Sequence, residues 1–202
     1  MDKLSYALGM SLGQSLQGSG VNKIDFDDFL DGVKTIFLKR TPKISAEEGN
    51  EILNNYFERV KAEKEVKDKR DKEENLKLAN AYLKENKTKD GIITTKSGLQ
   101  YRILKEGEGK NPTTHSRVKC HYEGKLINGN IFDSSYQRGE PAVFSLEQVI
   151  PGWTEGVALM KPGAKYEFHI PPRLGYGENG VPGHIPGNSA LIFTVELLEI
   201  VE

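Results

Sequence analysis

The chain is organised around one stretch, Val149-Ile150-Pro151-Gly152-Trp153, which continues as Thr154-Glu155-Gly156-Val157-Ala158-Leu159-Met160. Pro151 suits the first turn of a helix, where its missing N–H has no hydrogen bond to make. Trp153, Val157 and Met160 recur at intervals of four and three, which predicts that they share one face of a short helix ending at Lys161-Pro162-Gly163. From the residues alone, Trp153 is either an anchor of the core or the floor of a binding site.

Alternating side chains predict strands on both sides of this helix. Val118, Cys120 and Tyr122 share one face of an extended segment, and the polar residues between them share the other. Residues 99–103, 165–170 and 191–197 alternate in the same way, and Asn128-Gly129 is typical of a tight hairpin. We therefore expect an α+β protein in which residues 91–202 form an antiparallel β-sheet domain wrapped on one short helix.

The N-terminal residues 1–44 predict two short amphipathic helices. Leucines recur at every fourth position from Leu4 to Leu16, and Asp25 is a good N-cap for a second helix with a wide apolar stripe. Two helices of this kind cannot bury their apolar faces alone, and a second copy of the chain is the simplest partner. We expect a helical dimerisation region at 1–44, with homodimer contacts extending through residues 1–60.

A long connecting helix is expected over residues 45–90. Ser45-Ala46-Glu47-Glu48 has the form of a capping box, and helix-compatible residues continue to about Lys89. Residues 61–75 are almost all charged, with Val66 as the only large apolar residue, so the middle of this helix is expected to be a solvated rod. A rod that binds nucleic acid is the alternative, which the balanced charge disfavours.

Composition excludes several classes of partner. The formal net charge is −1, which gives no electrostatic reason to expect nucleic acid or an anionic membrane as a partner. No apolar run approaches the roughly 18 residues that a membrane-spanning helix needs. The first residues lack the basic-then-apolar layout of a secretory signal, so a cytoplasmic location is expected. A periplasmic location is the alternative if a signal peptide has been removed.

The residues suggest no metal, cofactor or nucleophile. Cys120 is the only cysteine, and neighbouring residues on a strand point to opposite faces, so Cys120 and His121 cannot form a catalytic pair. The four histidines show no metal-ligand spacing, and no phosphate-binding glycine motif is present.

Several blocks of sequence resemble the macrolide-binding immunophilins, the FKBP-type peptidyl-prolyl isomerases. The first two are Val118-Lys119-Cys120-His121-Tyr122-Glu123-Gly124 and Gly129-Asn130-Ile131-Phe132-Asp133-Ser134-Ser135. The others are Val149-Ile150-Pro151-Gly152-Trp153, Leu174-Gly175-Tyr176-Gly177 and Leu191-Ile192-Phe193-Thr194-Val195-Glu196-Leu197-Leu198. The similarity covers about residues 95–202, and the helical N-terminal half resembles the bacterial Mip-like dimeric subgroup.

The resemblance implies a hydrophobic proline pocket whose catalytic residues are Asp133, Tyr176 and Trp153, with Trp153 as its floor and Asp133 and Tyr176 as its polar contacts. Arg138 would support the Asp133 carboxylate, and the backbone N–H of Ile150 would face the ligand. The implied walls of the pocket are Tyr122, Phe132, Phe144, Val149, Ile150, Ile185 and Phe193. Judged without the resemblance, Asp133 reads as a turn-stabilising residue before Ser134-Ser135.

The chain departs from the family pattern at several positions. Ala142 replaces an aromatic residue, Gly187 replaces the second proline of a pair, and Val181 and His184 stand in a variable loop. These departures leave macrolide affinity and substrate preference open.

The resemblance implies an isomerase that acts on X-Pro bonds of unfolded or proline-containing protein clients, assists their folding, and accepts macrolide inhibitors. Two other interpretations stay open. One is a dimeric holdase-type chaperone or binding module with incidental isomerase activity. The other is an assembly protein organised by its long helix.

Overall fold

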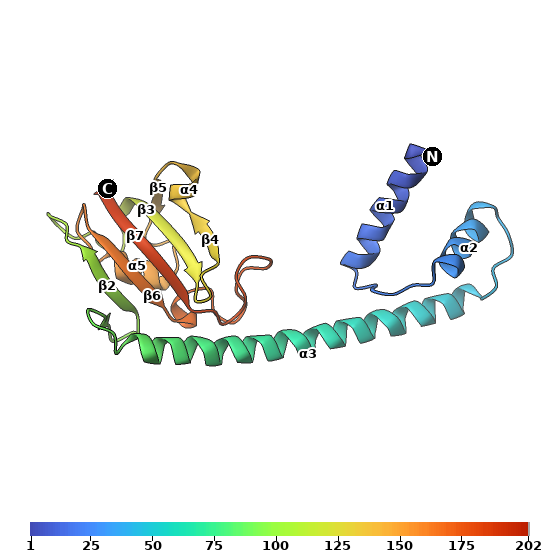
Figure 1. The fold of residues 1–202 in the computed structure, drawn as a ribbon, viewed down its shortest axis with the longest axis horizontal. Coiled ribbons are helices and arrows are strands. Elements are labelled where there is room, and N and C mark those ends of the chain that lie inside the picture. Colours follow the sequence, from blue (N-terminus) through green and yellow to red (C-terminus); the bar gives the residue numbers. More distant parts are fainter. Residues whose placement is uncertain (202) are drawn as a thin grey trace. The chain divides into compact units, whose positions relative to one another are not determined.

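The computed structural model describes residues 1–201, and the chain divides into two compact units, Met1–Lys67 and Asp68–Glu202. We call them the N-terminal unit and the C-terminal unit. Helix α3 (Ala46–Asn86) contributes its first half to the N-terminal unit and its second half to the C-terminal unit. Figure 1 labels most of their helices and strands.

The N-terminal unit contains helices α1 (Lys3–Gly18) and α2 (Phe26–Phe37) and the start of α3. The Asp25 carboxylate caps α2 as predicted, because it accepts hydrogen bonds from the backbone N–H groups of Asp27 and Asp28 at 3.0 and 3.1 Å. Neither α1 nor α2 contains a buried residue within the described chain. Their apolar stripes therefore lack the burial that stabilises short helices in water.

Helix α3 begins at the predicted capping box, where the Glu48 backbone N–H donates to Ser45 Oγ at 3.1 Å. It spans 41 residues, or roughly 60 Å at 1.5 Å per residue. It ends at Asn86 rather than near Lys89, because the chain turns through residues 87–91 and Gly91 adopts a φ of 77°. No helix of residues 1–201 is both long enough and apolar enough to cross a membrane.

The C-terminal unit is built on one antiparallel sheet with strand order β1-β2-β6-β7-β3-β4, to which β5 adds by pairing with β3. The strands are β1 (Ile93–Thr94), β2 (Gln100–Lys105), β3 (Arg117–Leu126), β4 (Ile131–Ser134), β5 (Ala142–Ser145), β6 (Lys165–Ile170) and β7 (Leu191–Ile200). Two short helices, α4 (Ser135–Arg138) and α5 (Pro151–Val157), and a 3-10 turn, η1 (Pro172–Leu174), complete the unit.

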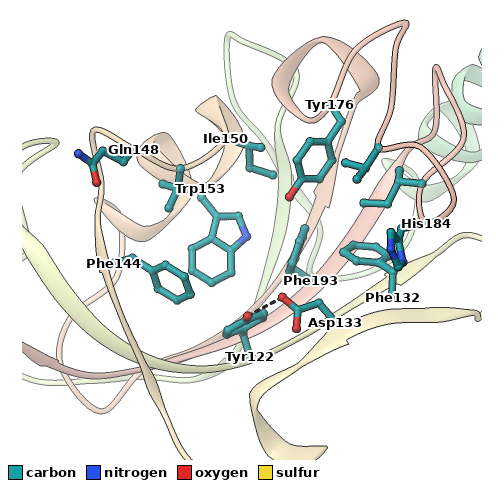
Figure 2. Close-up of a pocket in the computed structure, with 13 residues that line it drawn as sticks. Tyr122, Phe132, Asp133, Phe144, Gln148, Ile150, Trp153, Tyr176, His184 and Phe193 are labelled. Atoms are coloured by element: carbon teal, nitrogen blue, oxygen red, sulfur yellow. Dashed lines mark hydrogen bonds between the residues drawn. The ribbon is translucent and has the colours of Figure 1, made fainter. Parts of the chain in front are cut away.

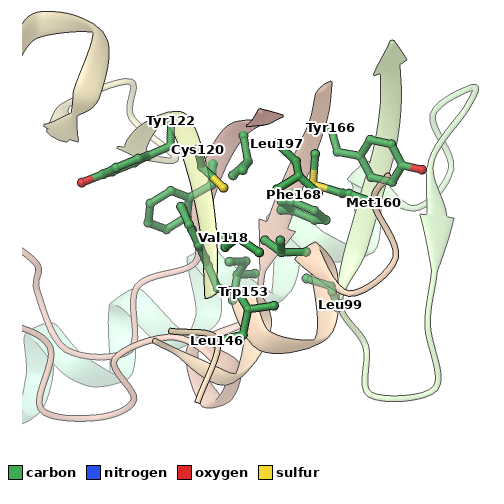
Figure 3. Packing of buried hydrophobic residues seen from close by; sticks show 14 of the residues in the cluster. Leu99, Val118, Cys120, Tyr122, Leu146, Trp153, Met160, Tyr166, Phe168 and Leu197 are labelled. Carbon is green, nitrogen blue, oxygen red and sulfur yellow. The ribbon is translucent and has the colours of Figure 1, made fainter. Parts of the chain in front are cut away.

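Helix α5 packs against one face of the sheet and forms the core with it (Figure 3). The helix is shorter than predicted. It ends at Val157, and Met160 follows in a tight turn in which Leu159 and Met160 donate to the carbonyls three residues earlier. Met160 is nevertheless fully buried, as the predicted pattern required. The α+β architecture expected from the alternating strands and the single short helix is confirmed.

On the opposite face of the sheet, His169 of β6 and Gln100 of β2 contact the second half of α3, which the strand pattern did not predict. Alternation placed His169 on a polar face, but its side chain is only 4 % exposed. The Tyr82 hydroxyl lies 2.7 Å from His169 Nδ1, and Gln100 Nε2 donates to the Leu83 carbonyl at 2.8 Å. The second face of the sheet is therefore buried at His169 and Gln100, where the polar side chains find partners on the helix, whereas Lys165 and Glu167 of β6 remain partly exposed.

Candidate active site

A cavity of about 520 Å³ opens between α5, the sheet and the loop after η1. Figure 2 shows its side chains converging from elements that are far apart in the sequence. The lining residues are Tyr122, Phe132, Asp133, Phe144, Gln148, Val149, Ile150, Trp153, Tyr176, Val181, His184, Ile185 and Phe193. The three named as catalytic and the seven named as walls from the sequence all lie in this set, which therefore brings the expected pocket residues together in one place.

The base of the cavity is a set of aromatic rings around Trp153. Its indole lies 5.2–5.3 Å from the ring centres of Tyr122, Phe144 and Phe193, at interplanar angles of 72–88°. Edge-to-face contacts of this kind favour a fixed arrangement of the rings. Trp153 is only 3 % exposed, so the rings form a dry apolar surface at the bottom of the cavity.

The start of α5 fixes the indole in this position. Pro151 occupies the first turn, and the Trp153 backbone N–H donates to the Ile150 carbonyl at 2.8 Å. Ile150 is the extended N-cap residue, and within residues 1–201 its own backbone N–H makes no hydrogen bond. A donor at the cavity wall is therefore available to a ligand.

The polar edge of the cavity is a network of three side chains. The Tyr122 hydroxyl donates to Asp133 Oδ2 at 2.6 Å, Arg138 Nη1 donates to Asp133 Oδ1, and Arg138 Nη2 donates to the Tyr122 hydroxyl at 2.7 Å. Arg138 is not among the residues that line the cavity, but its guanidinium contacts the Asp133 carboxylate. Helix α4 is capped by Ser134, which accepts from the Gln137 N–H, so the Asp133 carboxylate is not the group that caps this turn.

The network keeps Asp133 ionised. Partial burial by itself would raise the pKa of Asp133, but the hydrogen bonds from Tyr122 and Arg138 and the positive charge of Arg138 outweigh it and hold that pKa below its ordinary value. Burial, followed by the hydrogen bond to Asp133, raises the pKa of Tyr122, so its hydroxyl stays a neutral donor.

Tyr176 enters the cavity from the loop after η1 and remains 39 % exposed. In Figure 2 its hydroxyl is directed toward the cavity. Burial and the nearby charge of Asp133 raise the pKa of Tyr176, so it too is a neutral hydroxyl, and it has no hydrogen-bond partner within the described chain. It can donate to an oxygen of a ligand.

Three lining residues were not predicted as site residues. Gln148 precedes the quoted Val149-Ile150 pair, and Val181 and His184 belong to a small hairpin closed by the bridge between Val181 and Ile185. Proximity to Val149 was the available signal for Gln148. No local pattern marked Val181 or His184, because the hairpin is placed by contacts distant in sequence.

Cys120 and His121 lie in different surroundings. Burial raises the pKa of the Cys120 thiol to about 12, and His121 Nδ1 lies 3.0 Å from Ser135 Oγ on the other face of β3. Within residues 1–201, no three His, Cys, Asp or Glu side chains gather in a way that could hold a metal ion.

Comparison with known proteins gives matches along the whole chain. Residues 108–198 match the family model of FKBP-type peptidyl-prolyl cis-trans isomerases, and residues 1–103 match that of the domain amino-terminal to them. A probable isomerase FkpA of Neisseria meningitidis is 42% identical, over 99% of this chain and 74% of its own. The isomerase Mip of Coxiella burnetii is 41% identical, over 98% of this chain and 86% of its own.

Two further relatives bear on fold and location. The crystal structure of FkpA from Escherichia coli aligns with a TM-score of 0.78 at 40% identity, covering 98% of this chain and 95% of that one. A Legionella longbeachae relative, 36% identical over 98% of this chain and 85% of its own, is named outer membrane protein MIP. These relatives give the expected cytoplasmic location no support. The chain belongs to the FKBP-type peptidyl-prolyl cis-trans isomerases, alongside the Mip and FkpA proteins.

Proposed function

We propose that the cavity around Trp153 is the proline site of this isomerase, with Asp133 and Tyr176 as its polar catalytic contacts. The observation that carries the assignment is the indole at its base, 3 % exposed and enclosed by three aromatic rings. A proline ring is apolar and compact, so it suits a surface of this kind. The walls Phe132, Val149, Ile150 and Ile185 would enclose it from the sides.

The proposed mechanism is electrostatic rather than covalent. An X-Pro bond rotates over a barrier of about 18–20 kcal/mol, because the planar amide loses its resonance on twisting. Water stabilises the planar ground state by hydrogen bonding to its polar carbonyl. Transfer of the bond into a dry aromatic cavity removes that stabilisation, and about 4 kcal/mol less barrier is roughly a thousandfold in rate.

The polar groups at the edge would act on the rotating carbonyl. Asp133 is held ionised by Tyr122 and Arg138, so it presents a fixed negative charge whose interaction with the amide dipole changes as the bond twists. The Tyr176 hydroxyl and the Ile150 N–H would hold the flanking peptide oxygens. No proton transfer is needed.

The variants Asp133→Ala and Tyr176→Phe test the site. Both are expected to lower kcat/KM for a short proline peptide by about tenfold or more, since each removes a fixed polar contact of the transition state. Tyr6→Phe, an exposed tyrosine of α1, is the matched control and should leave kcat/KM unchanged. A macrolide inhibitor should quench the fluorescence of Trp153, the only tryptophan.

The same variants separate the isomerase from a holdase. A chain whose main work is to hold aggregation-prone clients would suppress their aggregation equally well with Asp133→Ala. Wild-type peptide isomerisation in both variants would refute the assignment of the cavity.

We further propose that the N-terminal unit is a dimerisation region. In this proposal the whole chain has three parts: residues 1–44 are the dimerisation helices, residues 45–90 are the connecting helix, and residues 91–202 are the isomerase domain. Support comes from an apolar groove of about 660 Å³ in the N-terminal unit. Its lining is Leu12, Asp28, Phe29, Gly32, Val33, Ile36, Phe37, Ile44, Gly49, Ile52 and Leu53. Since α1 and α2 contain no fully buried residue in the single chain, the same stripes on a second copy are the fitting occupant.

Phe37→Glu tests the dimer, because Phe37 is 83 % exposed in the single chain and lines the groove. The wild-type chain should sediment as a dimer and Phe37→Glu as a monomer. Lys34→Glu, on the same helix but outside the groove, should remain dimeric. If the wild-type chain sediments as a monomer, as Phe37→Glu does, the proposed dimer is excluded.

A dimer would let one unfolded client contact two catalytic cavities, which raises the effective concentration of the second. We expect Phe37→Glu to keep wild-type activity on a short peptide but to lose most of the wild-type advantage in refolding a whole protein limited by proline isomerisation. If wild type and Phe37→Glu refold the protein equally well, the dimer has no such role.

The name of the Legionella relative supports a location in the cell envelope, the alternative to the cytoplasmic expectation. Fractionation of cells that express the native gene tests it, with the chain expected in the periplasmic or membrane fraction.

A further inference from the structure

One wall of the cavity is a short loop, residues 178–189, which we call the wall loop. Its hairpin is closed by reciprocal backbone hydrogen bonds between Val181 and Ile185, at 2.8 and 2.9 Å. Val181, His184 and Ile185 line the cavity, and in Figure 2 His184 lies across it from Phe144. The position of this loop therefore determines the width of the cavity on that side.

The wall loop is also bonded to the backbone that carries Tyr176. The Gly180 N–H donates to the Tyr176 carbonyl at 3.1 Å, and the Asn188 N–H donates to the Gly177 carbonyl at 2.8 Å. A displacement of residues 187–188 would therefore shift both a wall of the cavity and the backbone beside a catalytic hydroxyl.

Two further hydrogen bonds connect the base of the wall loop to α3. Asn75 Nδ2 donates to the Gly187 carbonyl at 3.0 Å, and Asn188 Nδ2 donates to the Lys72 carbonyl at 3.1 Å. Asn188 is 8 % exposed and adopts a φ of 59°, a conformation that asparagine tolerates better than most residues. All four residues lie within the C-terminal unit.

Apart from its hydrogen bonds, the wall loop is restrained on the cavity side, where Ile185 belongs to the hydrophobic core and Val181 packs against it. Ile185 is buried toward the cavity, whereas residues 182–184 and 186 are exposed, and a Cβ built on Gly183 would meet nothing within 4 Å. Gly187 has no room for a side chain, because its Cβ would meet the Glu178 carbonyl and Lys72 Cγ.

We propose that α3 is part of the catalytic apparatus, and that Asn75 and Asn188 are positioning residues that hold the wall loop and so set how tightly the cavity accepts the residues beside proline. The hydrogen bonds to α3 hold the base of the wall loop at Gly187 and Asn188, and Ile185 holds the loop from the cavity side. The inference rests on the proposed assignment of the cavity as the proline site.

The experiment uses the full chain with Asn75→Ala and Asn188→Gly. Glycine keeps the positive φ of position 188 and removes the side chain with its amide. Asn80→Ala is the matched control, since Asn80 is an exposed asparagine on the same helix. The probes are short proline peptides that differ in the residue before proline. The measurements are KM and kcat, peptide Kd from Trp153 fluorescence, hydrogen exchange at the Val181 and Ile185 amides, and Tm.

We expect both variants to raise KM and Kd by about two- to tenfold, the range of one net hydrogen bond, with kcat changed less than about twofold. The differences in KM between peptides that differ in the residue before proline should become smaller. Amide hydrogen exchange at Val181 and Ile185 should become faster than in Asn80→Ala. A lower Tm with KM, discrimination and exchange equal to the control would assign these bonds to stability alone and overturn the proposal. Asn188→Gly decides by the same criteria if Asn75→Ala does not fold.

The outcomes also separate this inference from the site assignment. A wild-type chain whose Trp153 fluorescence does not respond to any proline peptide would refute the assignment of the cavity. A responsive wild type with unaffected variants would refute only the role of α3.

Discussion

Tyr122 joins the apolar and charged parts of the cavity: its ring packs edge-on against Trp153, and its hydroxyl donates a 2.6 Å hydrogen bond to Asp133. The same hydroxyl accepts from Arg138 at 2.7 Å. The Tyr122 side chain thus packs against the Trp153 indole and also orients the Asp133 carboxylate. The apolar surface and the charge are therefore held in one geometry before any substrate arrives.

Removal of Arg138 is expected to change the pH dependence of catalysis. Arg138 helps to lower the pKa of Asp133, and without it the effect of burial, which raises that pKa, is less opposed. In the proposed mechanism, activity needs the ionised Asp133 carboxylate and is lost as the pH falls through its pKa, so the acidic limb of the kcat/KM profile should move to higher pH in Arg138→Gln. Arg117→Gln, at an exposed arginine of β3, is the control. Superimposable profiles for the two would contradict the role of Arg138.

Gly124→Ala is expected to disturb the aromatic wall. A Cβ at Gly124 would lie 2.6 Å from Phe193 Cε1 and 2.7 Å from Phe132 Cε2, so both rings would have to move. We expect kcat/KM to fall about tenfold and the free energy of unfolding to fall by about 1–3 kcal/mol, as is usual for overpacking. Peptide kinetics and urea unfolding measure these changes. Lys125→Ala, at the next residue on β3, should change neither kcat/KM nor the free energy of unfolding.

Glu167 is expected to make stability depend on pH. The contact with His169, whose Nε2 lies 3.4 Å from Oε1, and the charge of Arg102 outweigh burial and lower the pKa of Glu167 to about 2. An unfolded glutamate has a pKa of about 4.3, so the contribution is complete above roughly pH 5 and is lost as the pH falls toward 2. Its side chain is 17% exposed, and we expect Glu167→Gln to cost about 1–3 kcal/mol at pH 7.

Urea unfolding of Glu167→Gln and wild type at pH 7 and pH 3 measures this difference, which should shrink at the lower pH. Glu106→Gln, an exposed glutamate, should match wild type at both. A difference that stays constant with pH would mean that Glu167 acts through packing alone.

Cys120 is expected to be inert in the folded chain. It is fully buried, and burial raises the pKa of its thiol to about 12, so almost no thiolate exists at neutral pH. A colorimetric thiol reagent at pH 8 should react at the rate of unfolding, and at once in denaturant. Rapid reaction of the native chain would show that this side of the core opens readily.

The local parts of the fold could be predicted because their signals are local. Pro151 and Trp153 indicated α5, the twofold alternation through Tyr122 indicated β3, and Asp25 and Ser45 indicated two helix starts. Each signal arises from backbone geometry or from a side chain that reaches its own backbone within a few residues. The end of α5 was missed because three-residue hydrogen bonds at Leu159 and Met160 preserve the burial of Met160 without helix.

The site was accessible only through the resemblance. A dry aromatic cavity has no motif with a fixed chemical spacing, and residues alone favoured Asp133 as a turn residue. Its lining comes from strands, a helix start and two loops, so the pattern that unites Phe144, Trp153 and Phe193 exists only in space.

The sequence by itself determined the main helices and strands, α1, α2, α3, α5, β2, β3, β6 and β7, and which face of each of these strands is apolar, since these follow from the periodicity of the chain. Only the tertiary structure decided that His169 is buried beneath Tyr82 and that Asn75 donates to Gly187, 112 positions away. Contacts of that kind form when two finished elements pack together. Their partners are selected by the geometry of packing, which no pattern within either element contains.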